Sequence, residues 1–162
     1  MVSRALRHLL TPDWLARRAF PPRTLRAIEH AIRDSEEKHE GEIRFALEAG
    51  LSPAHLRMST RARARQVFAQ LGVWDTEENS GVLVYVQLVD RRIEIVADRG
   101  IAGRVAQVEW DAVCRAMEHA FRRGEYEAGA LQAISAVTDI LARHFPAGPG
   151  DRNELPDKPV VI

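Results

Sequence analysis

The stretch VLVYVQLVDRRIEIVAD at residues 82–98 predicts a β-hairpin, and the rest of the fold can be placed around it. Residues 82–89 are almost continuously apolar, which is typical of a central strand that is covered on both faces. Asp90 and Arg91 form a candidate two-residue turn. Residues 92–98 alternate polar and apolar side chains, as a half-buried partner strand does. The hairpin makes these two strands antiparallel.

A third strand is predicted before the hairpin, at residues 42–48 (EIRFALE). Its alternating side chains predict one buried face and one wetter face, which carries Glu42 and Arg44. A helical pattern between residues 59 and 72 separates this strand from the hairpin. Because a strand–helix–strand connection within one sheet is right-handed, this strand and the first hairpin strand should run parallel.

Three further helices are predicted from apolar residues at helical spacing, over residues 23–38, 110–124 and 130–144. The predicted fold class is therefore α/β. It consists of a small mixed sheet, with one parallel crossover and one antiparallel hairpin, packed with about four to five helices.

Composition limits the kinds of function that the chain can have. Its 162 residues are 46% hydrophobic and 28% charged, as expected for one globular domain. The 23 basic and 23 acidic side chains balance, so no overall field attracts nucleic acid, and none is expected as a partner. The single cysteine, Cys114, excludes an internal disulfide and a zinc site built from several thiolates. Its position on an apolar helical stripe predicts a buried small side chain rather than a nucleophile.

The chain divides into three predicted parts. Residues 1–22 form a basic N-terminal arm, residues 23–146 an α/β domain, and residues 147–162 a tail rich in proline and glycine. The first 26 residues carry six arginines and one acid. Two interpretations of the arm stay open. It packs on the domain with its arginines in water, or residues 1–20 make a peripheral contact with an anionic membrane surface or a partner.

Strand direction predicts where the polar residues meet. If the first two strands are parallel and the third returns, Glu42, Asn79 and Asp98 should reach the same end of the sheet, with Arg99 beside them. Carboxylate and amide oxygens suit a hard divalent cation such as Ca²⁺ or Mg²⁺. Three interpretations stay open: a metal or small-ligand site formed by Glu42, Asn79 and Asp98, acid–base catalysis, and side chains that are only solvated and salt-bridged.

Four segments carry a resemblance to a known family: EENSGVLVYV at 77–86, DRRIEIVADRGI at 90–101, FRRGEY at 121–126 and HFP at 144–146. Over about residues 23–146 the chain resembles a TPM domain, the family with thylakoid-lumen, photosystem-associated and receptor-associated members. The resemblance implies a mixed α/β sandwich, which agrees with the fold predicted from the strand and helix patterns.

The family resemblance also implies a choice of functions: acid phosphatases, calcium binders and accessory proteins of membrane complexes. The chain looks like a short, soluble bacterial member, which implies a cytoplasmic or membrane-peripheral protein that accompanies a membrane-anchored TPM relative. We therefore expect a non-enzymatic accessory or binding module that holds a divalent cation at one end of the sheet. The alternative is a metal-assisted acid phosphatase, in which Asp98 and Glu42 act as ligand or base and Arg99 holds a phosphate oxygen.

Overall fold

A mixed four-stranded sheet forms the centre of the computed structural model, which describes residues 3–162. The strands lie in the order β3-β2-β1-β4. β1 is parallel to β2, and β2 is antiparallel to β3, so the predicted class and strand directions are confirmed. The strands are β1 (Glu42–Glu48), β2 (Gly81–Gln87), β3 (Arg92–Ala97) and β4 (Val160–Val161).

The described chain contains seven helices, more than the four to five that were expected. The additional ones are short: two lie in the N-terminal arm and one follows β3, where the sequence has too few residues to show a helical period. The helices are α1 (Arg4–Leu9), α2 (Trp14–Ala19), α3 (Pro22–Glu36), α4 (Thr60–Gln70), α5 (Arg99–Ala102), α6 (Gln107–Arg122) and α7 (Tyr126–His144).

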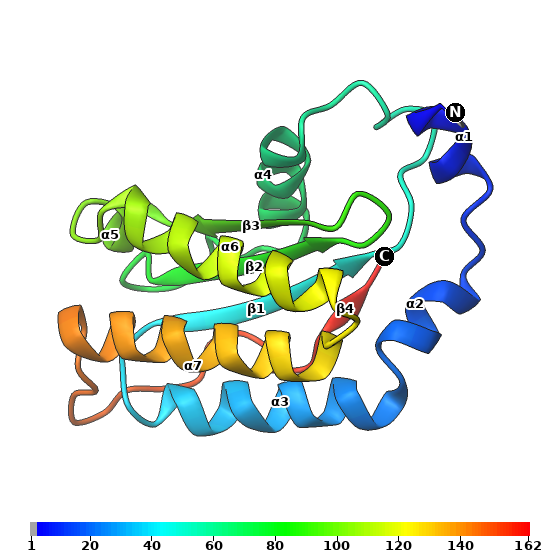
Figure 1. Cartoon of the computed structure of the whole chain (residues 1–162). Helices are drawn as coiled ribbons and strands as arrows, with labels where there is room; N and C mark the ends of the chain where they lie inside the picture. Colours follow the sequence, from blue (N-terminus) through cyan, green and yellow to red (C-terminus); the bar gives the residue numbers. More distant parts are fainter. Residues whose placement is uncertain (1–2) are drawn as a thin grey trace.

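The helices cover both faces of the sheet (Figure 1). α3, α6 and α7 pack on one face, where the alternate apolar residues of β1, β2 and β3 meet them in the main core. α4 lies on the other face and forms a smaller core there with residues such as Tyr85 and Leu83. None of the helices in residues 3–162 has both the length and the apolar composition that crossing a bilayer requires.

β1 departs from its predicted pattern, because both of its faces are buried. The expected wetter face carries Glu42 and Arg44, whose exposed fractions are only 3% and 6%, and Glu48 of the same strand is 4% exposed. Part of this face is covered by α4, whose Arg63 binds the Glu48 carboxylate. The remainder is covered by the C-terminal tail. The prediction of a wetter face is therefore wrong, since alternation shows which side chains are polar but not what covers them.

The tail passes over this second face and ends as a strand that the sequence did not predict. Val160 and Val161 of β4 pair in parallel with Ala46 and Leu47 of β1. Before that, Arg44 donates hydrogen bonds from Nη1 to the carbonyl oxygens of Pro156 and Lys158. A buried guanidinium thus holds the tail against the sheet.

Candidate functional site

The sheet topology places the predicted site residues at one end of the sheet. Glu42, the first residue of β1, lies opposite Gly81, the first residue of β2. Asp98, which follows β3, donates its backbone N–H to the carbonyl oxygen of Gly81 at 2.8 Å. Glu42, Gly81 and Asp98 therefore sit side by side, and their side-chain positions point to the same face of the sheet.

A backbone carbonyl separates Glu42 from Asp98. A Cβ atom built on Gly81 would lie only 1.9 Å from the carbonyl oxygen of Val73, so this carbonyl occupies the space between the two acids. Because neighbouring strands are about 4.8 Å apart, the backbones of Glu42 and Asp98 are roughly 10 Å apart. These two residues share an end of the sheet, but the Val73 carbonyl lies between them.

Asn79, Asp98 and Arg99 form one connected cluster. The Asn79 side-chain oxygen accepts a hydrogen bond from Arg99 Nε at 3.1 Å, and the Asn79 backbone has the left-handed φ of 52°. Asp98 Oδ1 accepts the backbone N–H of Arg99 at 2.7 Å and so caps the start of α5. The structure thus brings three of the four predicted residues into contact.

The Glu42 carboxylate contacts the tail instead. Its two oxygens accept the backbone N–H groups of Glu154 and Leu155, both at 3.1 Å. Burial raises the pKa of Glu42, although these two hydrogen bonds oppose the shift. The resulting arrangement is a buried carboxylate that positions the tail at this end of the sheet.

Two oxygens near this point are buried without a hydrogen-bond partner within residues 3–162: Asp98 Oδ2 and Ser80 Oγ. A buried polar atom that makes no hydrogen bond is costly, and more so when it carries negative charge. Ser80 directly precedes Gly81, whose carbonyl oxygen accepts the backbone N–H of Asp98. These two oxygens are therefore free to bind a cation or a water molecule.

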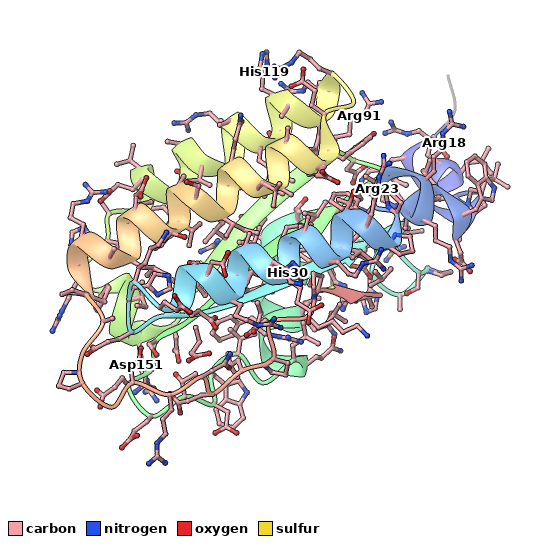
Figure 2. All side chains as sticks on the ribbon, turned by 90° about the horizontal axis from the view of Figure 1, so that it is seen from below. Arg18, Arg23, His30, Arg91, His119 and Asp151 are labelled. Atoms are coloured by element: carbon pink, nitrogen blue, oxygen red, sulfur yellow. The ribbon has the colours of Figure 1, made fainter. Side chains whose placement is uncertain are left out.

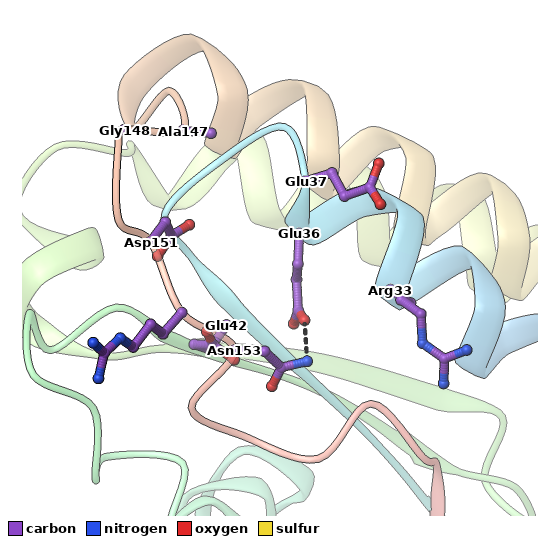
Figure 3. Close-up of a pocket in the computed structure, with 9 residues that line it drawn as sticks. Arg33, Glu36, Glu37, Glu42, Ala147, Gly148, Asp151 and Asn153 are labelled. Atoms are coloured by element: carbon purple, nitrogen blue, oxygen red, sulfur yellow. Dashed lines mark hydrogen bonds between the residues drawn. The ribbon is translucent and has the colours of Figure 1, made fainter.

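Two open hollows flank the tail at this end of the molecule. The first has a volume of about 410 Å³, and Figure 3 shows Glu36, Glu42 and Asp151 around it. The second has a volume of about 760 Å³ and includes Ser80. We call the residues that line the two hollows the acidic rim. They are Arg33, Glu36, Glu37, Glu40, Glu42, Glu77, Glu78, Ser80, Ala147, Gly148, Pro149, Gly150, Asp151, Arg152, Asn153 and Glu154.

Glu36 is a rim residue that the sequence analysis did not identify. Its Oε1 accepts the backbone N–H of Ile43 at 2.9 Å, and its Oε2 accepts Nδ2 of Asn153 at 3.2 Å (Figure 3). Burial, and secondarily the negative charges of Glu42 and Asp157, raise the pKa of Glu36 to about 9. No sequence signal distinguishes it within the charged run at 36–40, because Asn153 and Asp157, two of the residues that act on it, come from the far end of the chain.

The raised pKa of Glu36 predicts a pH-dependent stability. An unfolded chain releases this proton near pKa 4.5, whereas the folded chain holds it to about 9. Between these values the folded state binds more protons, so the free energy of unfolding should fall as the pH rises. Glu36→Gln keeps an acceptor for Ile43 and cannot ionise. It should be more stable than the wild type at pH 8 and equal to it only below the unfolded pKa, at about pH 4, in urea unfolding.

Its neighbour Glu37 provides the matched control, since it is exposed and lines the same hollow. Glu37→Gln should retain the wild-type loss of stability with pH. If the free energy of unfolding fell with pH equally in the wild type and in Glu36→Gln, Glu36 would be ionised across this range, which contradicts the prediction.

Two residues with catalytic potential are structural. Ring atom Nδ1 of His39 accepts the backbone N–H of Gly41 at 3.2 Å, and its Nε2 lies 2.8 Å from the Ser35 hydroxyl. Burial lowers the pKa of His39, so the ring stays neutral. Burial also raises the pKa of Cys114 to about 12, which leaves the thiol protonated at neutral pH.

The acidic side chains are spread along the rim rather than gathered at a point. Among residues 3–162, no three His, Cys, Asp or Glu side chains come close enough to ligate one metal ion together. A cation at this end would therefore need hydroxyl, amide or backbone oxygens, or water, in addition to carboxylates. Such mixed oxygen sets are common for Ca²⁺.

Comparison with known proteins now identifies the family. The sequence model of the TPM domain matches residues 17–140. The chain belongs to the TPM domain family. The solved NMR structure of the BA42 protein from the psychrophilic bacterium Bizionia argentinensis is similar to this TPM domain, with 32% identity and a TM-score of 0.77. The match covers 86% of this chain and 93% of BA42. A comparison with curated proteins gave no match.

Proposed function

We propose that this TPM protein is a non-enzymatic binding module that holds a divalent cation, Ca²⁺ or Mg²⁺, at the end of the sheet that carries the acidic rim. The cation would bind near Asp98, Asn79 and Ser80, with Glu42 and the rim carboxylates as the surrounding negative charge. In this proposal the module is an accessory protein, and its partner is a membrane-anchored protein of the same family.

The observation that carries the proposal is the pair of buried oxygens without a partner, Asp98 Oδ2 and Ser80 Oγ. A cation within reach of these oxygens would supply the partner that each of them lacks. Crowded negative charge supports the same interpretation, because burial and neighbouring carboxylates raise the pKa values of Glu36 and Glu42. A positive ion at the rim would reduce this repulsion.

No observation favours the phosphatase alternative over binding. The two residues assigned to catalysis already have structural partners: Asp98 caps α5, and Arg99 binds Asn79. If Arg99 were to hold a phosphate oxygen with Nε, it would first have to leave Asn79.

Adding Ca²⁺ or Mg²⁺ to the metal-free protein should raise its unfolding temperature. At one hundred times the dissociation constant, a bound ion stabilises the fold by about 2.7 kcal/mol. For a chain of this length that corresponds to roughly 5–11 °C. Differential scanning calorimetry with each metal measures the shift, and titration calorimetry gives the affinity. The same samples should not hydrolyse an aryl phosphate.

Variants locate the site. Asp98→Asn preserves the helix cap, since asparagine caps as well as aspartate, but removes the negative oxygen. Together with Ser80→Ala, it should weaken the metal affinity by about tenfold or more. Asp13→Asn is the control: it removes an exposed acid at the N-terminus of α2 and should leave the metal affinity unchanged. The proposal fails if neither metal shifts the transition at millimolar concentration, or if Asp98→Asn binds as tightly as Asp13→Asn does.

A further inference from the structure

The N-terminal arm is fixed to the end of the sheet that lies opposite the acidic rim (Figure 1). The ring of His8 is buried, and its Nδ1 accepts the backbone N–H of Leu51 at 3.0 Å. His8 Nε2 lies 3.1 Å from the Asp90 carboxylate in the β2–β3 turn, and Arg4 Nε donates to the same carboxylate at 2.8 Å. Positions 4 and 8 lie on one side of α1, so the other side of this helix must face outward.

The outward side of the arm is apolar. Leu6, Leu9 and Leu10 follow the helical spacing i, i+3, i+4 and are 44%, 54% and 68% exposed. Trp14 opens α2 and is 56% exposed, whereas Ala16 and Phe20 of the same segment are buried in the core. Four of the eight large hydrophobic side chains that the described chain leaves exposed thus lie within nine consecutive residues.

Positive charge surrounds this apolar side. Arg17 and Arg18 lie on α2 beside Trp14, and both are exposed. Figure 2 shows Arg18, Arg23 and Arg91 near one end of the molecule, whereas Asp151 of the acidic rim lies toward the other end. The chain has no net charge, so any attraction to an anionic surface must come from the local arginines of the arm.

We infer that the outward side of α1 and α2 binds an anionic lipid surface. We call it the arm surface, and its residues are Leu6, Leu9, Leu10, Trp14, Arg17 and Arg18. Leucines and a tryptophan on short helices, flanked by arginines, enter the boundary between headgroups and acyl chains, where the indole ring is favoured and the guanidinium groups meet the negative headgroups. A partner protein with acidic groups would complement the same arginines, so binding to vesicles that contain no protein is the result that distinguishes a lipid surface from a protein.

This inference does not depend on the cation site, because the two lie at opposite ends of the sheet. Most of the arm surface also precedes the part of the chain that matches the TPM domain, although Arg17 and Arg18 lie within it. The TPM match begins at residue 17, so α1 and the first half of α2 precede it.

The full-length protein should cosediment with phosphatidylcholine vesicles that contain phosphatidylglycerol, and should not cosediment with phosphatidylcholine alone. Arg17→Gln combined with Arg18→Gln should weaken this binding about thirtyfold, since each arginine near an anionic surface contributes about fivefold. Leu9→Gln combined with Leu10→Gln should weaken it about tenfold or more, because it removes exposed apolar area while keeping good helix formers. Binding should also fall as the salt concentration rises.

Matched controls remove one arginine and one exposed apolar side chain away from the arm. The first control is Arg65→Gln, on the exposed side of α4. The second is Val108→Gln at the start of α6, where Val108 is 65% exposed. Both should bind like the wild type. In a Trp74→Phe background, Trp14 is the only exposed tryptophan, so its fluorescence should shift to the blue on anionic vesicles.

Three results would overturn the inference: no binding to anionic vesicles, equal binding to neutral ones, or arm variants that bind as the controls do. Circular dichroism separates these outcomes from misfolding, since every substituted arm residue is exposed and none belongs to the His8–Asp90 contact.

Discussion

Gly81→Ala should destabilise the protein by about 3 kcal/mol or more, the largest loss that we expect from one added methyl group. The new Cβ would lie 1.9 Å from the Val73 carbonyl oxygen and 2.9 Å from its carbonyl carbon. Backbone atoms cannot move aside as a flexible side chain does. Gly81 also lies between β1 and Asp98, and is hydrogen-bonded to Asp98, so the strand itself has little room to shift.

Urea unfolding followed by circular dichroism measures this loss, and Gly103→Ala is the control. Gly103 has an ordinary φ of −74°, and a Cβ there would meet only the Arg99 carbonyl oxygen, at 3.7 Å. Its stability should therefore stay within about 0.5 kcal/mol of the wild type. If Gly81→Ala were as stable as Gly103→Ala, the close approach of Val73 to the sheet would be wrong.

Arg63→Met should also cause a large loss, about 3–5 kcal/mol, because it leaves a buried carboxylate unpaired. Arg63 holds Glu48 through two hydrogen bonds, Nε to Oε2 at 2.9 Å and Nη2 to Oε1 at 2.8 Å. Tyr85 donates its hydroxyl to the same carboxylate. Burial, reinforced by Glu48, raises the pKa of Tyr85, so the hydroxyl remains a donor.

An exposed pair of the same chemistry provides the comparison. Arg143 binds Glu109 at 3.0 Å, but its side chain is 60% exposed. Arg143→Met should therefore cost about 1 kcal/mol or less in the same unfolding experiment. Combining Arg63→Met with Glu48→Gln should recover part of the loss, since the buried charge is then gone. Equal effects of Arg63→Met and Arg143→Met would contradict a buried ion pair.

The elements that the sequence predicts well are those with a regular period. The apolar run at 82–89 and the alternation at 92–98 predict the hairpin, and the helix between β1 and β2 predicts their parallel direction. This direction in turn places Glu42, Asn79 and Asp98 at one end of the sheet. Local pattern is sufficient for these features because each depends on neighbouring residues in the chain.

Long-range contacts explain what the sequence could not predict. Arg44 and Glu42 appear as the polar side of a half-buried strand, but the last residues of the chain cover them. The raised pKa of Glu36 arises first from burial, and then from the negative charges of Glu42, six residues further on in β1, and of Asp157 in the tail. The carbonyl of Val73, which separates Glu42 from Asp98, is a backbone atom of a loop. No residue type at position 73 indicates it.

The direction of the central strands determines how a molecule bound through the arm would be oriented relative to a bilayer. β1 spans roughly 20 Å from Glu42 to Glu48, and the arm lies beyond its C-terminal end. A molecule attached through the arm would hold its carboxylates on the water-facing side, away from the phosphate layer. Lipid headgroups and rim acids would then not compete for the same ions, and the rim would stay open to a protein that approaches from solution.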